Sequence, residues 1–112
     1  MEDLLNAQFK KGVLEMCVLV LLGERDRYGY ELVHDISGRF EIAEGSMYPL
    51  LRRLKDEGCV STYLQESTEG PARKYYSLTT EGEKIRDGLV GEWEEFITAV
   101  DALLKGEDHA EG

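Results

Sequence analysis

Basic side chains are scarce in this chain of 112 residues: 13 lysines and arginines stand against 23 acidic residues, a net charge of −10. This balance excludes a polybasic tail protein and argues against a partner held only by bulk attraction to phosphate. Long apolar runs are missing too, because the longest, residues 16–22, falls well short of the roughly 20 residues of a membrane span. The first residues lack the features of a signal peptide. We therefore expect a cytoplasmic protein with no membrane partner.

Cysteine is also rare: Cys17 and Cys59 stand far apart in the sequence and form no C-x-x-C. Two reduced, packed thiols are favoured over a disulfide or a redox pair. The sequence contains no Gly-rich phosphate loop, no G-x-S-x-G and no H-E-x-x-H, and its two histidines, His34 and His109, are isolated. We therefore expect no enzymatic activity, no catalytic residue, no metal and no cofactor.

The acidity is unevenly distributed along a chain whose length allows one domain. Residues 80–112 contain three basic and ten acidic side chains, whereas residues 45–79 contain five basic and four acidic ones. Only the middle of the chain is therefore suited to face a polyanion. The alternative is that the acidic end is a solvated helix and nothing more.

Two helices are predicted in the first 40 residues. The first runs from about residue 9 to 22 and stops at Gly23. Its second half is apolar on nearly every face, so other parts of the protein must cover it all round. A turn with Asp26 as candidate cap leads into the second. Gly38 weakens or ends this second helix. Its apolar stripe consists of Leu32, Val33, Ile36 and Phe40.

The third predicted helix has two different faces. Pro49 is tolerated only early in a helix, so this helix begins a few residues before it, and Gly58 ends it after Glu57. A stripe with i, i+3, i+4 and i+7 spacing faces the core and consists of Met47, Leu50, Leu51 and Leu54. The other face consists of Tyr48, Arg52 and Lys55, flanked by Ser46, Pro49 and Arg53.

Two β-prone stretches, residues 60–65 and 73–78, surround a polar Gly-Pro turn and predict a hairpin. Alternation places Lys74, Tyr76 and Leu78 on one side, with Tyr76 and Leu78 toward the core, and Arg73, Tyr75 and Ser77 on the other. We expect Arg73 and Lys74 at the hairpin tip.

The last predicted helix, residues 80–105, is too long for the body that precedes it. Its length is roughly 40 Å at about 1.5 Å per residue, whereas the earlier residues form a body about 25–30 Å across. Its cap is Thr80, in a capping-box pattern, or Thr79. We divide the chain into a winged-helix domain (residues 1–79), a dimerisation helix (80–106) and a disordered tail (107–112).

The apolar stripe of this helix would be a liability in water, so a second copy of the chain is the simplest cover. The predicted interface combines residues of the first and last helices: Leu14, Val18, Leu21, Leu89, Trp93, Phe96, Ile97, Val100, Leu103 and Leu104.

Three helices followed by a hairpin predict a winged helix-turn-helix: a mainly α-helical fold with a β-hairpin wing and a long C-terminal dimerisation helix. In this fold the third helix suits the major groove of double-stranded DNA, while the wing touches adjacent backbone or minor groove. Two alternatives remain. Arg52 and Arg53 can instead pair with Asp56 and Glu57 on a solvated face. The chain can also be an acidic winged-helix module for protein–protein interaction without DNA binding.

Four stretches resemble PadR-type transcriptional regulators, in the order of that family. They are residues 11–22 (KGVLEMCVLVLL), 28–32 (YGYEL), 44–58 (EGSMYPLLRRLKDEG) and 71–82 (PARKYYSLTTEG). The last two together are specific, and the similarity covers about residues 5–105. The single C-terminal helix resembles the compact branch of the family.

The resemblance implies a homodimeric repressor that binds a palindromic operator, often beside its own gene. Ala43 departs from the family, which usually carries a Ser- or Asn-like cap there. Carried over by position, the recognition helix contributes Ser46, Tyr48, Arg52 and Arg53, the wing contributes Arg73, Lys74 and Tyr75, and the second helix begins at Tyr28. Lys10 and Lys11, at the start of the first helix, can hold a phosphate.

Trp93 matches a tryptophan with which some compact members bind flat aromatic compounds between the long helices of the dimer. The resemblance therefore implies a planar aromatic small-molecule effector, because an aromatic pair across a two-fold axis can stack on a planar ligand. The alternative is that Trp93 only packs in the interface.

Overall fold

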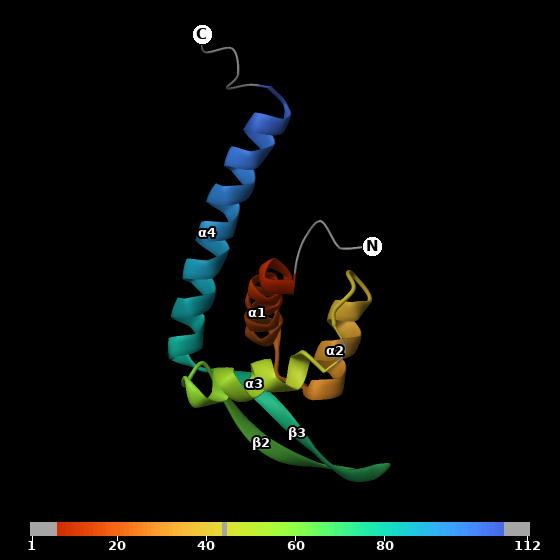
Figure 1. Cartoon of the computed structure of the whole chain (residues 1–112). Coiled ribbons are helices and arrows are strands. Elements are labelled where there is room, and N and C mark those ends of the chain that lie inside the picture. Colours follow the sequence, from red (N-terminus) through yellow and green to blue (C-terminus); the bar gives the residue numbers. More distant parts are fainter. Residues whose placement is uncertain (1–6, 44, 107–112) are drawn as a thin grey trace.

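The computed structural model describes residues 7–43 and 45–106. Its elements follow in the order α1 (Ala7–Glu24), β1 (Arg27–Tyr28), α2 (Gly29–Ser37), α3 (Met47–Asp56), β2 (Val60–Ser67), β3 (Gly70–Leu78) and α4 (Thr80–Leu104). Figure 1 shows α1, α2 and α3 above a hairpin, with α4 rising past α1. The predicted winged helix-turn-helix with a long C-terminal helix is confirmed. The predicted tail, residues 107–112, lies outside the described residues.

The core lies where α1, α2, α3 and the sheet meet. The stripe predicted for α3 is fully used, because Leu51 and Leu54 are completely buried and Met47 and Leu50 are at most 3% exposed. Pro49 stands at the third position of α3, as a proline requires. Gly58 follows the end of α3 with a φ of +80°, a conformation that favours glycine.

Helix α1 differs in one respect from its prediction. Gly23 does not stop it, because the helix continues to Glu24. A side chain at position 23 would meet the guanidinium of Arg86, so this glycine allows the start of α4 to approach α1. Leu14 and Val18 are 3% and 0% exposed and pack in the hydrophobic core of the single chain. Their contribution to a dimer interface stays a prediction.

The sheet has three strands in the order β1-β3-β2, where two were predicted. The additional strand β1 pairs antiparallel with β3, with Arg27 opposite Tyr76. The hairpin turn is also tighter than predicted, since Ser67 pairs with Gly70. Arg73 and Lys74 consequently lie opposite Gln65 and Leu64, along the strands and not at the tip. Tyr76 faces the core as predicted and is 8% exposed.

Helix α4 begins at the alternative cap, because the Thr79 hydroxyl accepts a hydrogen bond from the Gly82 amide at 3.0 Å. Its first turns pack on α1 and its far half extends beyond the other elements (Figure 1). Phe96, Leu103 and Leu104 are 53%, 52% and 78% exposed in the single chain. Within residues 7–43 and 45–106, no helix combines the length and apolar character of a membrane span.

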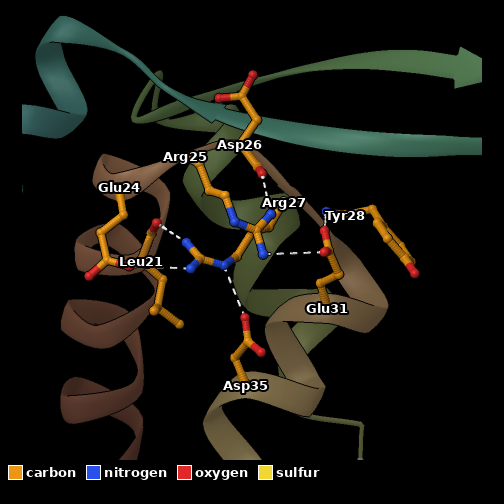
Figure 2. Close-up of polar contacts among 8 residues, drawn as sticks. All are labelled: Leu21, Glu24, Arg25, Asp26, Arg27, Tyr28, Glu31 and Asp35. Atoms are coloured by element: carbon orange, nitrogen blue, oxygen red, sulfur yellow. Dashed lines mark hydrogen bonds and ion pairs between the residues drawn. The ribbon is translucent and has the colours of Figure 1, made fainter.

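One buried charged side chain joins α1, β1 and α2. Arg27 is 7% exposed, and its Nε donates to Asp35 of α2 at 3.0 Å. Its Nη2 donates to Glu24 at 3.2 Å, and its Nη1 donates to the carbonyl of Leu21 in the last turn of α1 (Figure 2). The Leu21 carbonyl otherwise accepts only a long bond of 3.4 Å from the Arg25 amide, so this guanidinium completes its hydrogen bonding and joins α1 to β1 and α2.

We predict that Arg27→Met destabilises the fold by about 2–3 kcal/mol, because it leaves Asp35 without its cation in a partly buried site. The matched control is Arg25→Met, which removes the neighbouring Arg25–Glu31 pair, whose arginine is 55% exposed. That change should cost less than about 1 kcal/mol. Urea unfolding at equal protein concentration measures both. Equal losses for the two variants would contradict this role of Arg27.

Candidate nucleic-acid interface

The outward face of α3 presents the predicted tyrosine and basic side chains together. Tyr48 is 51% exposed, and Arg52 and Lys55, one and two turns further on, are exposed as well. Within the residues that the structure describes, Arg52 forms no ion pair. The predicted pairing with Asp56 is therefore not seen for Arg52, which leaves its guanidinium available to an external anion.

Arg53 is placed differently, on the side of α3 that faces α1. Its Nη2 donates to Glu15 of α1 at 2.7 Å, and its Nη1 lies 3.3 Å from Glu57. The hydrogen bond that Arg53 donates to Glu15, together with the nearby negative charges, raises the pKa of the Arg53 guanidinium above its ordinary value. Arg53 therefore pairs with Glu57, which is the alternative to DNA contact that the sequence left open. Arg53 ties α3 to α1 and is less free than Arg52.

Helix α3 starts later than we expected from the family, which usually carries a capping residue at the position of Ala43. The helix begins at Met47 and Ser46 takes the cap position, so the expectation that Ala43 replaces the cap is wrong. The Ser46 hydroxyl donates to the carbonyl of Ala43 at 2.7 Å. This bond closes the turn before α3 and orients Ser46 at the helix entrance.

Tyr48 is held against the start of α2 by a close approach at Gly29. A Cβ on Gly29 would lie 2.6 Å from Cε1 of the Tyr48 ring, so only glycine allows this contact. Glu31 completes the helix start by accepting a hydrogen bond from the Tyr28 amide at 3.2 Å. The two helices of the helix-turn-helix are therefore in direct contact at the exposed face of α3.

Three tyrosines form a row across the sheet. Tyr28 of β1 and Tyr63 of β2 both stand opposite Tyr75 of β3. The Tyr75 ring lies edge-on to Tyr28 at 5.4 Å and stacks on Tyr63 at 5.6 Å. Arg73 lies two residues along β3, and its guanidinium carbon is 4.7 Å from the centre of the Tyr28 ring. The structure brings together Tyr28, Arg73 and Tyr75, which the sequence assigned to one interface.

Asp26 does not cap α2 as predicted; it supports the tyrosine row. Its carboxylate accepts a hydrogen bond from the Tyr63 hydroxyl at 2.7 Å. This bond raises the pKa of Tyr63 above its ordinary value, so the phenol stays protonated near neutral pH. The bond joins β2 to the segment before β1, which stiffens the base of the hairpin.

The outer end of the hairpin is acidic. Glu66 and Glu69 lie at or beside the turn, and both are exposed. The exposed Lys74 and the half-buried Arg73 lie nearer the base. Basic character in the hairpin is therefore concentrated next to the tyrosine row, and the turn itself repels a polyanion.

Lys10 and Lys11 lie away from the hairpin, near the beginning of α1. They line one side of a pocket of about 770 Å³, whose opposite side includes Ser46 and Arg53 of α3. The structure therefore brings this predicted lysine pair close to α3, but to its α1-facing side rather than to the face of Tyr48 and Lys55.

Cys17 and Cys59 carry free thiols, as predicted. Burial raises the pKa of both, which keeps them protonated and unreactive near neutral pH. In the described part of the chain, no three His, Cys, Asp or Glu side chains are grouped as metal ligands would be.

Sequence reasoning missed Arg27, Gly29 and Tyr63 as residues that shape this interface. A signal for Gly29 was present, because it stands between two tyrosines at a predicted helix start. Arg27 contacts Leu21 and Asp35, 6 and 8 positions away in other elements, and Tyr63 contacts Asp26, 37 positions away. No local sequence pattern reveals these contacts.

Comparisons with known proteins agree with this geometry. A family model described as the transcriptional regulator PadR-like family matches residues 18–87. An uncharacterised protein of Lysinibacillus sphaericus is 35% identical over 100 residues, which cover 86% of this chain and 92% of that protein.

Solved structures are similar over most of their length. A PadR-like transcriptional regulator of Bacillus cereus is 38% identical, with a TM-score of 0.80 over 88% of this chain and 98% of that one. A transcriptional regulator of Streptococcus is 37% identical, with a TM-score of 0.79 over 88% of this chain and 98% of that one.

Proposed function

The chain belongs to the PadR-like family of transcriptional regulators, and from this membership we propose that it is a homodimeric repressor of a palindromic DNA operator. Regulation through DNA binding follows from the family, whose members are transcription factors and not enzymes. A regulator of this kind acts on the chromosome, so we place it in the cytoplasm of a bacterial cell.

The exposed face of α3 carries this proposal. In a chain of net charge −10, Tyr48, Arg52 and Lys55 form an exposed surface without an acidic residue between them. Arginine and lysine donate to guanine edges and phosphates in the major groove, and a tyrosine hydroxyl reaches a phosphate or a base. Ser46 stands at the helix entrance, and Arg53 acts through its hold on α1.

The middle of the hairpin provides the second contact. Arg73 and Lys74 of β3 lie opposite Gln65 and Leu64 of β2. They are close to Tyr75 and Tyr28. Positive side chains at this position suit the sugar–phosphate backbone next to the groove that α3 enters.

A second copy is proposed along α4. Phe96, Leu103 and Leu104 are exposed in the single chain, and they share a stripe with the half-buried Leu89, Trp93, Ile97 and Val100. Leu21 of α1 is half-buried and adjoins this surface through the packing of α1 on α4. A two-fold dimer of this kind sets two α3 helices about 34 Å apart, one turn of the duplex.

Trp93 is proposed to stack on a planar aromatic effector in that dimer. Its side chain is half-buried on the exposed stripe of α4, between Leu89 and Phe96. Two such indoles across a two-fold axis provide flat apolar surfaces for a planar ligand. Entry of the ligand shifts the angle between the two α3 helices of the dimer and so releases the DNA.

The alternative function is protein–protein interaction without DNA. An adaptor has no use for the cluster of Tyr48, Arg52 and Lys55 on α3, whereas a DNA reader requires such a cluster. Substitution in that surface therefore separates the two.

We predict that Arg52→Ala weakens operator binding at about 100 mM salt by roughly tenfold or more, because a groove-facing arginine contributes about 1–3 kcal/mol. Arg53→Ala should also weaken binding, because it releases Glu15 and Glu57 next to the duplex. The measurement is a gel shift with the inverted repeat from the DNA upstream of the gene.

The control is Lys84→Ala, which removes an exposed cation from α4 and should leave binding unchanged. Circular dichroism verifies that each variant is folded. Parental affinity in both arginine variants would show that α3 is not the reading helix.

The dimer is tested by Phe96→Glu, which should give a monomer in sedimentation, because an unpaired charge buried in an apolar interface costs several times RT, about 3 kcal/mol or more. Thr98→Glu adds the same charge to the opposite face of the same helix, at an exposed position, and should remain dimeric. A parental protein that sediments as a monomer at micromolar concentration would refute the dimer.

Effector binding at Trp93 is tested with proflavine, a planar aromatic cation, in the absence of DNA. Trp93 is the sole tryptophan, so quenching of indole emission reports on it alone. We expect strong quenching in the parent and a loss of proflavine affinity of about tenfold in Trp93→Leu. Unquenched emission in the parent, or equal proflavine affinity of the parent and Trp93→Leu by calorimetry, would show that Trp93 only packs in the interface.

A further inference from the structure

The end of α3 and the start of α4 meet at one compact joint, although the whole hairpin separates them in the sequence (Figure 1). We call this contact the α3–α4 joint. It consists of Gly58 and Cys59, which follow α3, and of Thr79 and Gly82, which begin α4. The joint connects the helix proposed to read DNA directly to the helix proposed to form the dimer.

On the side of α3, the joint is a tight helix ending. The Gly58 amide donates to the carbonyl of Lys55 at 3.0 Å, and the Cys59 amide donates to the carbonyl of Leu54 at 2.9 Å. With Gly58 at a φ of +80°, these two bonds form a Schellman motif. Cys59 is also only 3% exposed. Its backbone is therefore fixed relative to α3.

On the side of α4, one threonine makes the connection. The Thr79 amide donates to the carbonyl of Cys59 at 3.1 Å. The Thr79 hydroxyl lies 2.6 Å from the Gly58 carbonyl oxygen and 3.0 Å from that of Cys59, and it donates its proton to this pair. The same hydroxyl accepts from the Gly82 amide at 3.0 Å. Thr79 therefore binds the end of α3 and caps α4 with one side chain.

Gly82 allows α4 to approach the end of α3 closely. It is buried, and a Cβ at this position would lie inside van der Waals contact with the carbonyl oxygen of Cys59 and 2.6 Å from Cδ1 of Leu78. A backbone oxygen cannot turn aside as a flexible side chain does. An alanine here must therefore push α4 away from Cys59 by about 1 Å.

Helix α4 has a second support one turn further along, against α1. There the guanidinium of Arg86 lies over Gly23, in the space that a Cβ on Gly23 would need. Arg86 is about 6 Å along the helix from Gly82, so a movement of about 1 Å at Gly82 tilts α4 by roughly 10°. The residue at position 82 therefore determines the angle between α3 and α4.

We propose that the α3–α4 joint sets the spacing between the two operator half-sites that the dimer accepts, with Thr79 and Gly82 as its positioning residues. This inference rests on the proposed function, since it takes α3 as the reading helix and α4 as the dimer helix. Tyr48, at the far end of α3, is roughly 15 Å from the joint, so a tilt of about 10° moves it by about 3 Å. In a two-fold dimer the movement occurs twice, and the sum exceeds the roughly 3.4 Å between successive base pairs.

A joint that only stabilised the fold would behave differently. Its loss would weaken binding to every operator by a similar factor, through a smaller folded fraction. A joint that sets an angle instead changes which half-site spacing is preferred. The affinity of α3 for a single half-site stays at the parental value, because Thr79 and Gly82 lie at the opposite end of α3 from Tyr48.

The angle is measured in DNA-free protein as a distance between two nitroxides, by electron–electron double resonance. The labels are attached at Arg52→Cys of α3 and Thr98→Cys of α4, both exposed positions. Cys17→Ala removes the half-buried thiol, and the buried Cys59 takes up no label. Labelled chains are diluted with unlabelled ones, so that the distance is measured within one chain.

Two variants change the joint in different ways. Gly82→Ala should shift the mean distance by about 3–5 Å, because position 98 lies about 24 Å along α4 from the pivot. Thr79→Val should broaden the distance distribution, because it removes the hydroxyl that connects the two helices. Thr79→Ser keeps a hydroxyl and should restore the parental distribution.

Each variant has a matched control on α4. Gly91→Ala adds the same methyl group where no atom of the described residues lies within 4 Å of it, and Thr80→Val removes an exposed hydroxyl from the next residue. Both controls should keep the parental distance. Circular dichroism verifies folding. If Gly82→Ala does not fold, the comparison of Thr79→Val with Thr79→Ser decides.

Half-site spacing is measured by gel shift, with unlabelled protein and inverted repeats whose spacer is lengthened or shortened by one or two base pairs. The parent should prefer the natural spacer. Gly82→Ala should prefer a different spacer, and Thr79→Val should bind several spacers with similar affinity. Binding to a single half-site, measured in parallel, should equal that of the parent in both variants.

A parental distance in both Gly82→Ala and Thr79→Val, or the same shift in Gly91→Ala, would overturn the proposal. An altered distance with the parental spacer preference would overturn it as well. Failure of the proposed function is distinguishable, because the distance is measured within one chain and without DNA. A protein that shows the altered distance but binds no operator retains the joint as the determinant of the helix angle and refutes its effect on spacing.

Discussion

The guanidinium of Arg27 is the interaction on which the arrangement of this protein depends. It satisfies the Leu21 carbonyl at the end of α1, binds Asp35 of α2, and belongs to a strand that pairs with β3. Helix, sheet and helix-turn-helix therefore meet at one buried cation. A buried charge is tolerated only when its donors are satisfied, and here each donor also connects two elements.

The orientation of α3 follows from this frame and from two further contacts on opposite sides. Gly29 admits the Tyr48 ring against the start of α2, and Glu15 of α1 holds Arg53. Between these contacts, Arg52 and Lys55 point outward. The outward face of α3 and the middle of the hairpin thus present positive side chains within an acidic chain, so affinity for a polyanion depends on orientation rather than on total charge.

Periodic features were predictable from the sequence, and contacts across elements were not. The stripe of Met47, Leu50, Leu51 and Leu54 specified the buried face of α3, and Tyr76 followed from alternation along a strand. Strand β1 could not be recognised, because its two residues gain their hydrogen bonds from a partner 47 or more positions away. The burial of Leu14 and Val18 in the core of one chain was not predictable for a similar reason: an all-round apolar helix needs cover, but periodicity does not say which surface provides it.

The acidic turn of the hairpin limits how far the protein reaches along DNA. A duplex carries one negative charge per about 1.7 Å of its axis, so Glu66 and Glu69 keep the outermost part of the hairpin off the sugar–phosphate backbone. The outermost proposed contacts of the hairpin with DNA are therefore those of Arg73 and Lys74. The stretch of duplex protected from nucleases should therefore be short, and the flanking base pairs stay accessible to other proteins while the regulator is bound.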